Sequence, residues 1–423
     1  MKKKSLLLLA LIPLLASCSF SYTYTVPGLG GGGEIEDDDI DDAGAYNIQI
    51  WVDEKISDLT KTQVSDFVMA SGGKYTINLT VNNVGEASAA EKMLQDVRNG
   101  ADLFCFAQDQ LNRLRVAGAL AKITGATEAA VKADTLPDAI KAATINDSLY
   151  AFPITSDNGY FLYYDKSYFA ESDIGNMTTL LAKCTKEKRL YFEGRSNGFY
   201  TASYFIATGC RSDWHIDEAT CQFDSFTDDY DSDNGIIAAK GLKELDSDKV
   251  VADSSASKLG DACVALVSGI WNYEAAAKRL GNNLGCAPLP NFTVDGKDYH
   301  LGSFDGYKML GVKRQTDAKK ASVCRKLARY LSSEECQKAR FNRVKWGPAN
   351  TNASKMPDVL EHPGLAALAE QHKYAIPQVQ CPGNWFSALS TAAKSIKSGS
   401  SDADIVNVLK SYKASIKDLL ADE

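Results

Sequence analysis

The chain has 423 residues and a mass of 45.8 kDa, which is too long for one ordinary hydrophobic core, so two lobes or domains are expected. Hydrophobic residues make up 45% of it and charged residues 24%, which excludes a fibrous or wholly disordered chain. The formal net charge of −8 argues against nucleic acid as a partner, because phosphate binding depends on clustered lysine and arginine.

Residues 1–17 have the pattern of a secretory signal peptide. Three lysines precede an apolar run over residues 6–15, which is too short to span a bilayer. The next residues, Leu15-Ala16-Ser17-Cys18, resemble the bacterial lipobox, in which a peptidase cuts before the cysteine and its sulfur carries a diacylglyceryl group. The resemblance implies an extracytoplasmic lipoprotein anchored to the cell membrane through Cys18. A plain signal peptide that happens to end before a cysteine is the alternative.

Residues 18–45 are predicted to form a flexible linker behind this anchor. The segment is polar, then rich in glycine, then acidic, and such a composition cannot bury enough apolar surface to order itself. Its glycine tract matches the nucleotide-binding pattern G-x-G-x-x-G, but no strand precedes it and no helix follows. The tract is therefore interpreted as part of a tether.

From residue 46 the hydrophobic pattern alternates between the strand period and the helix period. This order predicts a parallel sheet covered on both faces by helices. Ligands of such sheets bind at the carboxyl ends of the strands, here after Trp51 and after Phe106. Strands are predicted over 47–53, 74–81 and 101–108, and helices over 60–73, 86–100 and 109–120.

A second set of elements follows. Residues 148–169 are predicted to cross between two lobes, and residues 262–271 and 283–290 are predicted to be buried strands. Residues 317–342 read as a pair of helices, the second starting with a capping box from Ser332 to Glu335. A last helix is expected over 402–420.

Motifs for catalysis or metal binding are weak in this chain. Its four histidines leave little room for a histidine base, and we find no nucleophile elbow, Walker loop or His-Glu-x-x-His. Residues 228–235 look faintly like a calcium loop, but Asn234 stands where that loop needs glycine and Lys240 where it needs glutamate. Neither a metal nor a cofactor is expected.

Ten cysteines are present, and nine remain once Cys18 is assigned to lipid. They show no zinc spacing. Cys210 and Cys221 flank a predicted strand–turn–strand and are the first candidates for a disulfide; Cys263 and Cys286 come second. Buried free thiols are at least as good an interpretation for most of them.

Aromatic residues stand beside polar residues at several predicted loop positions. A sugar ring has an apolar face and a rim of hydroxyls, so a sugar site needs flat aromatic surfaces together with carboxylates and amides. Taken singly, Phe106, Trp271 and Trp385 could be core aromatics, which is the commoner fate of an aromatic residue after a buried strand. Asp109 could cap a helix and Asp157 a turn. The positions are Phe106, Asp109, Asp157, Asn158, Trp271, Tyr273, Trp385 and Phe386.

Five segments in order resemble the extracellular solute-binding proteins of the maltose/maltodextrin-binding class: residues 101–123, 146–169, 265–290, 302–342 and 376–389. The resemblance implies a two-lobed α/β fold of the periplasmic-binding-protein type (class II), with three interlobe crossings and a ligand cleft between the lobes. The N-lobe is then expected over 46–154 plus 304–360, and the C-lobe over 155–303 plus 361–423.

The resemblance also implies site residues. Phe106 stands at the position of a stacking tryptophan and Asp109 at that of a sugar-binding aspartate, whereas Gln110 replaces an arginine and loses its two-pronged donor. Asp157 matches a glutamate near the hinge. Trp271 matches another stacking tryptophan.

Further positions follow from the same comparison. Trp385 matches a third stacking tryptophan, Tyr273 a tryptophan beside Trp271, and Glu54 lies near an Asp-Lys pair after the first strand. Asn197 and Phe199 stand where the family has a glutamate and a tyrosine. The expected ligand-binding residues are therefore Glu54, Phe106, Asp109, Asp157, Asn158, Asn197, Phe199, Trp271, Tyr273 and Trp385.

The expected function is that of a lipid-anchored, monomeric receptor of an ABC importer. It is expected to close its lobes on an oligosaccharide, with maltodextrin among the candidates, and to deliver it to a membrane permease without chemistry of its own. Two alternatives stay open: a receptor of the same fold for a polyamine or a peptide, and a tethered glycosidase.

Overall fold

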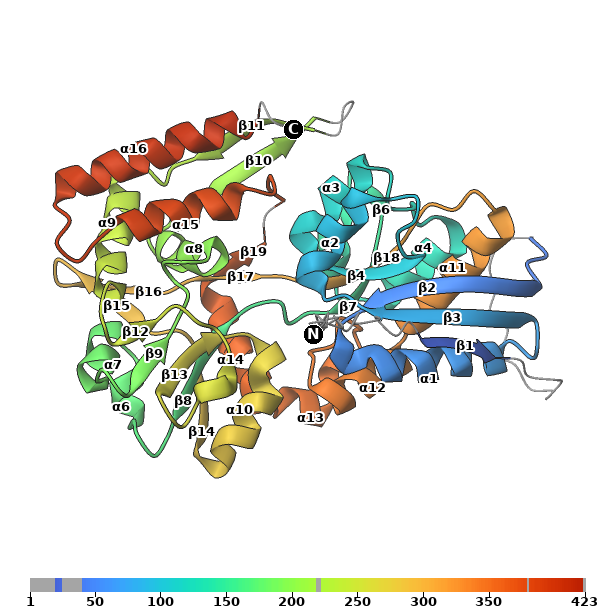
Figure 1. The fold of residues 1–423 in the computed structure, drawn as a ribbon, viewed down its shortest axis with the longest axis horizontal. Coiled ribbons are helices and arrows are strands. Elements are labelled where there is room, and N and C mark those ends of the chain that lie inside the picture. Colours follow the sequence, from blue (N-terminus) through green and yellow to red (C-terminus); the bar gives the residue numbers. More distant parts are fainter. Residues whose placement is uncertain (1–19, 25–39, 218–221, 379, 421–423) are drawn as a thin grey trace, which may run out of the picture.

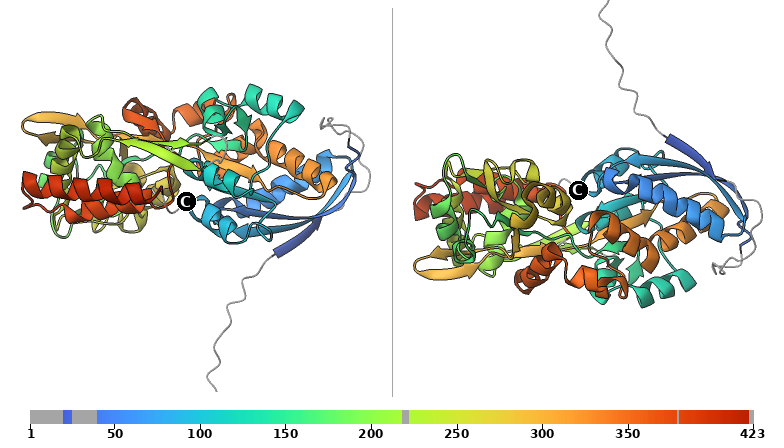
Figure 2. Two further views of the ribbon diagram at one scale, coloured as in Figure 1. Left: turned by 90° about the horizontal axis from the view of Figure 1, so that it is seen from above. Right: turned by 90° about the horizontal axis from the view of Figure 1, so that it is seen from below.

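The computed structural model describes residues 20–24, 40–217, 222–378 and 380–420. They form two α/β lobes that lie side by side along the long axis of the molecule (Figure 1). Views from above and below show the same separation into two bodies (Figure 2). The expected two-lobed fold is therefore confirmed. Residues 1–19, which hold the predicted signal peptide and Cys18, lie outside the described residues.

The N-lobe is built on a mixed six-stranded sheet. Three of its strands are parallel as predicted, because each is followed by a helix that returns the chain to the same edge. The remaining strands run antiparallel to their neighbours. In sheet order they are β1 (Phe20–Tyr24), β3 (Tyr75–Asn83), β2 (Gly44–Val52), β4 (Leu103–Ala107), β18 (Lys308–Val312) and β7 (Phe152–Thr155).

Helices cover this sheet and meet it with apolar side chains. The helix after β2 buries Ile56, Val64, Phe67 and Val68, which recur at helical spacing. The main ones are α1 (Glu54–Ala70), α2 (Glu86–Gln95), α3 (Leu111–Val116), α4 (Gly125–Asp134), α11 (Ala318–Leu331) and α12 (Glu334–Val344). The cap of α12 is Ser333, whose hydroxyl accepts from Cys336 N at 3.3 Å, one residue later than predicted.

The C-lobe is built on a five-stranded sheet. Its central strand β13 is buried at every residue, as its continuous apolar sequence predicted. In sheet order the strands are β12 (Val250–Val251), β9 (Arg189–Tyr191), β13 (Cys263–Ser268), β8 (Phe161–Asp165) and β14 (Leu284–Ala287). Its main helices are α8 (Gly198–Ala207), α9 (Asp233–Leu242), α10 (Tyr273–Leu280), α14 (Pro363–Gln371), α15 (Trp385–Ser395) and α16 (Asp402–Asp418).

The chain passes between the lobes at three places. It leaves the N-lobe sheet after β7 and enters the C-lobe sheet at β8, returns at Gly306 into β18, and passes again between α12 and α14, which packs on β8 and β14. Between the lobes, β17 (Ser303–Asp305) pairs in parallel with β19 (Ala375–Pro377). These segments form the hinge of a cleft.

The folded N-lobe begins within the segment that was predicted as linker. Asp42 is fully buried, and its carboxylate accepts hydrogen bonds from Lys326 and Ser322, both at 2.8 Å, and lies 2.7 Å from Lys74 Nζ. Burial alone raises the pKa of a carboxyl, but these partners outweigh burial and lower the pKa of Asp42 well below its ordinary value. Strand β1, inside the same predicted linker, pairs with β3.

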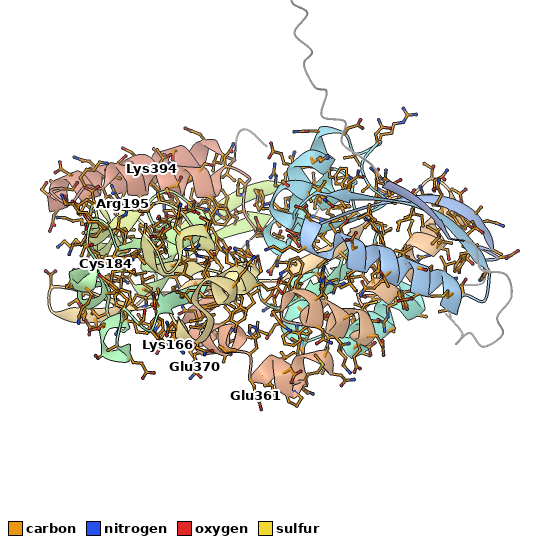
Figure 3. All side chains as sticks on the ribbon, turned by 60° about the horizontal axis from the view of Figure 1, so that its bottom comes forward. Lys166, Cys184, Arg195, Glu361, Glu370 and Lys394 are labelled. Atoms are coloured by element: carbon orange, nitrogen blue, oxygen red, sulfur yellow. The ribbon has the colours of Figure 1, made fainter. Side chains whose placement is uncertain are left out.

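Arg195 fastens the carboxyl-terminal helices to the C-lobe. Its guanidinium donates to the carbonyl of Lys394 at 3.2 Å, in the last turn of α15, to that of Ile396 at 2.6 Å, just after the helix, and to Asp246 Oδ1 at 2.5 Å. Arg195 and Lys394 are labelled near one another beside these helices (Figure 3). The contact therefore fixes the carboxyl end of α15 against the C-lobe.

Two further sequence interpretations are settled in part by the structure. Cys263 and Cys286 are free thiols, so the candidate disulfide between them is ruled out and the free-thiol alternative holds for both; Cys263 Sγ donates to Ala265 O at 3.2 Å. Cys210 is also a free thiol, and its proposed partner Cys221 lies outside the described residues.

Residues 228–235, which look faintly like a calcium loop in sequence, lead into α9, whose cap is Ser232. Among the described residues no group of acidic, histidine or cysteine side chains has the arrangement of a metal site.

Buried hydrophobic residues form two clusters: one fills the N-lobe and continues onto one face of the C-lobe sheet, and the other fills the rest of the C-lobe. The largest fully buried side chains include Phe67 and Phe104 on the N-lobe side and Tyr204 and Trp385 on the C-lobe side. Within the described part of the chain, no helix has the length and apolar character needed to cross a membrane.

Candidate functional site

A cavity of about 540 Å³ lies between the lobes. Both lobes and the crossing segments contribute to its wall, as expected for a cleft at the carboxyl ends of sheet strands. The N-lobe side consists of Asp53, Lys55, Gly85, Glu86, Ala87, Ala107, Asp109, Gln110, Lys308 and Trp346; the other side consists of Asn158, Glu193, Asn197, Phe199, Tyr200, Ser254, Trp271, Gln378 and Phe386.

The N-lobe wall contains the starts of two helices. Asp53 directly follows β2 and caps α1, its Oδ1 accepting from Lys55 N at 2.8 Å. Gly85 follows β3 and occupies the cap position of α2, so that Glu86 stands in the first turn. Helix starts favour polar and acidic side chains, and both helices start at the strand ends that border the cavity. The carboxylates of Asp53 and Glu86 therefore lie at this wall.

Aromatic rings form much of the C-lobe wall. Phe199 stacks on Phe304 with ring centroids 5.5 Å apart and meets Phe386 edge-on at 6.1 Å. Tyr200 packs edge-on against Phe199 at 5.4 Å. Because Phe199 and Phe386 are only partly buried, their rings offer apolar faces to the cavity.

Trp271 lies on the same cavity at the first turn before α10. Its six-membered ring folds back over Gly269, where an added Cβ would lie 2.1 Å from the ring. Only glycine at 269 allows this ring position. The indole of Trp271 is half-buried and lines the cavity.

A chain of polar side chains joins the N-lobe to the hinge. Gln378 Nε2 donates to Asp109 Oδ1 at 2.9 Å, and Gln378 Oε1 accepts from Asn158 Nδ2 at 3.0 Å. Gly306 packs closely against it: an added Cβ would lie 2.4 Å from Gln378 Oε1 and would displace that amide. Burial raises the pKa of Asp109 to about 6, although a hydrogen bond from Gln110 opposes the rise.

Two lysines reach Trp271 from the N-lobe side. Lys55 Nζ donates to the carbonyl oxygen of Trp271 at 2.7 Å, and Lys308 Nζ lies 5.8 Å from the centroid of its ring. The two lobes therefore touch each other across the cavity at Trp271.

The structure brings five of the sequence-predicted residues to this cavity: Asp109, Asn158, Asn197, Phe199 and Trp271. Asn197 has a double role, because its Oδ1 also caps α8 by accepting from Phe199 N at 3.1 Å. Glu54 is the first residue of α1, and its neighbours Asp53 and Lys55 line the cavity in its place.

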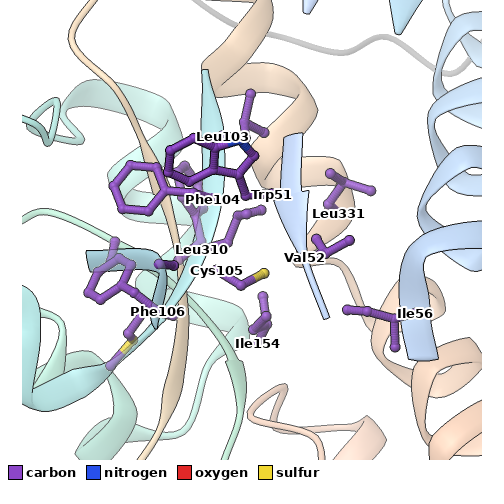
Figure 4. Packing of buried hydrophobic residues seen from close by; sticks show 14 of the residues in the cluster. Trp51, Val52, Ile56, Leu103, Phe104, Cys105, Phe106, Ile154, Leu310 and Leu331 are labelled. Atoms are coloured by element: carbon purple, nitrogen blue, oxygen red, sulfur yellow. The ribbon is translucent and has the colours of Figure 1, made fainter. Parts of the chain in front are cut away.

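Phe106 lies away from the cavity, in the N-lobe core (Figure 4). It is 0% exposed and its ring packs on Phe104 at 5.6 Å. The side chains of a strand alternate between its faces, and this alternation directs Phe106 into the packed interior. Phe106 is therefore a core residue, which was the alternative interpretation of its sequence position.

Trp385 and Tyr273 also lie off the cavity wall. Trp385 is 1% exposed, and its Nε1 donates to Tyr412 Oη at 2.9 Å inside the C-lobe core. Its neighbour Phe386 lines the cavity instead. Tyr273 packs on His362 with ring centroids 4.0 Å apart.

Asp157 lies behind the cavity wall, where it supports the crossing after β7. It is 0% exposed, and its Oδ2 accepts from Gly347 N at 2.5 Å. Lys308 Nζ approaches its other oxygen at 3.9 Å. Asp157 thus holds together two crossing segments and the first residue of β18.

Sequence reasoning missed several wall residues, chiefly Lys308, Trp346, Glu86 and Gln378. One signal was available: Lys308 precedes the apolar run "MLGV", and a lysine in a strand buried at every position is rarely there for packing. Trp346 stands in a loop after α12, and only the fold shows that this loop reaches the cleft.

The fold and this cavity define a two-lobed binding protein whose ligand site lies between the lobes. The family model of bacterial extracellular solute-binding proteins matches residues 64–367, and the chain belongs to that family.

Individual relatives agree with this assignment. A structure solved with acarbose is 26% identical, with a TM-score of 0.76 over 89% of this chain and 100% of that chain. The maltodextrin binding protein MalE1 from L. casei BL23, solved without ligand, is 21% identical, with a TM-score of 0.74 over 89% and 99%. A galactooligosaccharide-binding protein of Bacillus subtilis (strain 168) is 26% identical over 170 residues. That segment spans 40% of this chain and 37% of the relative.

Proposed function

We propose that this protein is the substrate-binding receptor of an ABC importer and captures an oligosaccharide in the cavity between its lobes. The observation that carries the proposal is the composition of the cavity wall, where the rings of Trp271, Phe199 and Phe386 stand opposite the polar groups of Asp53 and Asp109. Aromatic faces bind the apolar side of a sugar ring, and carboxylates and amides accept and donate to its hydroxyls.

The size of the cavity supports an oligosaccharide of a few rings. A volume of about 540 Å³ lies within the ordinary range of small-molecule sites. Relatives whose names or ligands are maltodextrin, acarbose and galactooligosaccharide support a carbohydrate, though they differ in the sugar. The ligand class is therefore proposed and the particular sugar is left to experiment.

Delivery to a membrane permease follows from the same role. The closed lobes would present one shape to the permease, and closure is favoured by ligand contacts that exist only in the closed state. A lipid on Cys18 would keep the receptor at the membrane. The site residues under this proposal are Asp53, Asp109, Asn158, Asn197, Phe199, Trp271 and Phe386.

A cationic solute is the second candidate, and one specific observation favours it. Four carboxylates line the cavity, from Asp53, Glu86, Asp109 and Glu193, against the two lysines Lys55 and Lys308. A cavity with carboxylates and aromatic rings can bind the ammonium group of an amine as well as the hydroxyl groups of a sugar. The two candidates differ in whether the bound ligand is charged.

A thermal-shift screen of the purified protein separates these candidates. It should contain malto-, xylo-, fructo- and galacto-oligosaccharides, amino acids and polyamines, and product analysis by chromatography should test for hydrolysis. A ligand at one hundred times its dissociation constant stabilises the folded state by about 2.7 kcal/mol. Response to one oligosaccharide class without cleavage supports the proposal, whereas response to polyamines alone or hydrolysis of the sugar would overturn it.

Two variants localise the binding. Trp271→Ala should lose most of the shift, because it removes a ring of the cavity wall. Trp214→Phe is the matched control, since Trp214 lies in β10 (Ser212–Ile216) and does not line the cavity. If both variants keep the full shift, the oligosaccharide binds elsewhere.

A further inference from the structure

Lys308 is a buried cation at the wall of the cavity. It is 4% exposed, and its Nζ lies 3.6 Å from the centroid of the Trp346 ring and 5.8 Å from that of Trp271. Asp157 Oδ1 lies 3.9 Å from the same nitrogen. A bulge between Lys308 and Met309 shifts the register of β18 against β7 at this point. The ammonium thus sits among two aromatic rings and a carboxylate.

The polar atoms around Lys308 are poorly satisfied. Lys308 Nζ has no hydrogen-bond partner among the described residues, and the same holds for Asp157 Oδ1 and Glu86 Oε1. Burial raises the pKa of Glu86, while the charge of Lys308 lowers it. Buried polar atoms without hydrogen bonds cost stability, so packing alone does not account for a lysine here.

Without its ammonium, the same cluster would be a cation site. Trp346 and Trp271 provide ring faces within the range of a cation–π contact, and Asp157 and Glu86 provide carboxylates. Such a combination of aromatic faces and acidic groups is what recognises an ammonium ligand. The chain places its own ammonium at that position.

We infer that Lys308 is a specificity-determining residue: its ammonium occupies the aromatic and acidic cluster of Trp346, Trp271, Asp157 and Glu86 and thereby excludes ligand amines. The inference rests on the proposed function, because it takes the cavity between the lobes as the ligand site. The inference also explains how a cavity lined by carboxylates can select an uncharged oligosaccharide: Lys308 keeps amines out. A feature that disfavours the wrong ligand is one of the two general routes to specificity.

The size of this exclusion follows from charge repulsion. A second cation about 5 Å from Lys308 Nζ is repelled strongly enough at an effective dielectric constant near 20 to lose on the order of a hundredfold in affinity. A neutral hydroxyl meets no such repulsion. The cluster joins residues of both lobes, because Trp271 comes from the C-lobe and Trp346 from the N-lobe side.

Chemical rescue of Lys308→Ala tests the inference directly. The substitution removes the last three methylenes and the ammonium, and n-propylammonium replaces those atoms. The melting temperature of wild type and variant should be followed against n-propylammonium chloride and against n-propanol, which has the same length without charge. We expect a saturable rise for the variant with the amine, no rise with the alcohol, and no rise for wild type with either.

The matched control is Lys55→Ala, which removes the other lysine of the wall from an exposed position. It should show no saturable response to n-propylammonium. If Lys308→Ala is recovered folded only when the amine is present during purification, that result also supports the inference. Equal responses to amine and alcohol, an equal amine response in wild type, or failure to fold under both conditions would overturn it.

Failure of this inference is distinguishable from failure of the proposed function. The proposed function is tested by oligosaccharides on the wild-type protein, and the inference by a small amine on Lys308→Ala. As a further readout, spermidine should shift the variant and leave wild type unchanged. Wild-type protein that binds oligosaccharide together with a variant that gains no amine response would sink the inference alone.

Discussion

The ammonium of Lys55, at the start of α1 in the N-lobe, donates to the main-chain carbonyl of Trp271 in the C-lobe at 2.7 Å. The bond crosses the cavity and joins the two lobes at the residue whose ring lines the proposed sugar site. A contact that exists only with the lobes closed favours the closed state, with or without ligand. Closure is therefore built partly from the protein's own residues.

Lys55→Met should shift the ligand-free protein toward an open conformation. Loss of this exposed, charge-assisted bond removes about 1 kcal/mol from the closed state, which corresponds to about a fivefold loss of ligand affinity. Small-angle scattering should give a larger radius of gyration without ligand, and calorimetry the weaker affinity. Lys61→Met on the same helix, where Lys61 pairs with Asp58, is the control. An unchanged radius and affinity would contradict a role in closure.

Asp109 should make stability depend on pH in the weakly acidic range. Its folded-state pKa is raised from an ordinary 3.8 to about 6, so the folded state binds a proton more readily than the unfolded one. Stability should therefore rise as pH falls from about 6 to about 4, and the buried charge should cost about 2 to 3 kcal/mol at pH 7. Asp109→Asn should remove this contribution.

The measurement is urea unfolding of wild type and Asp109→Asn at several pH values between 4 and 8. Other raised carboxyl groups, such as Glu244, titrate in both proteins and cancel in the difference. The variant should be the more stable protein at pH 7, and the difference should vanish near pH 4. A difference that stays constant with pH would contradict the assignment to Asp109.

The parallel strands of the N-lobe could be predicted from the sequence because hydrophobic periods report which residues face a core, and β2, β3 and β4 were all readable in this way. The arrangement in two lobes was expected from the chain length and the family resemblance. The antiparallel strand β18 was not readable, since a strand of five buried residues carries no period that tells its direction. The direction of β18 follows from the side on which the chain returns to the N-lobe sheet, because it comes from the hinge at Gly306.

The site was only partly predictable, for a related reason. The family resemblance predicts stacking rings at Phe106 and Trp385, but both side chains lie in the core, because one residue of register decides between cavity and core. Phe386, the neighbour of Trp385, reaches the cavity. Trp346 and Gln378 come from loops far apart in sequence, and only the assembled hinge brings them together.

Asp42→Asn should destabilise the N-lobe strongly. The substitution removes the charge that pairs with Lys326, whose side chain is 2% exposed, and it leaves that cation buried without compensation. The expected loss is about 3 to 5 kcal/mol at pH 7. Because the folded-state pKa of Asp42 is lowered, its contribution is present above the ordinary value and is lost as pH falls below about 4.

Urea unfolding at pH 7 and pH 3 tests whether the stabilisation by Asp42 decreases as pH falls. The gap between wild type and Asp42→Asn should narrow at pH 3, since the wild-type carboxyl is then largely protonated in the unfolded state while it stays ionised in the folded state. Asp41→Asn, at an exposed neighbouring position, is the matched control and should change little. A gap as large at pH 3 as at pH 7 would show that the charge of Asp42 is not what stabilises the lobe.

Cys18→Ala should release the protein from the membrane under the proposed lipid attachment. The thiol is the atom that would carry the diacylglyceryl group, and alanine offers none. Fractionation of cells that express each form should find wild type with the membranes and the variant in the soluble extracytoplasmic or secreted fraction. Metabolic labelling with a radioactive fatty acid should mark wild type alone. Labelled Cys18→Ala would place the lipid on another residue.

Phe386 and Trp385 should separate binding from stability, although they are adjacent. Phe386→Ala removes a ring from the cavity wall and should weaken ligand binding by about tenfold or more with a small loss of stability. Trp385→Phe removes the hydrogen bond to Tyr412 inside the C-lobe core, and should lower the free energy of unfolding by about 1 to 3 kcal/mol. Once folded, the Trp385 variant should bind with nearly wild-type affinity, because its ring does not line the cavity. Calorimetry with the oligosaccharide found in the screen and urea unfolding together decide this, and the reverse pattern would return the stacking role to Trp385.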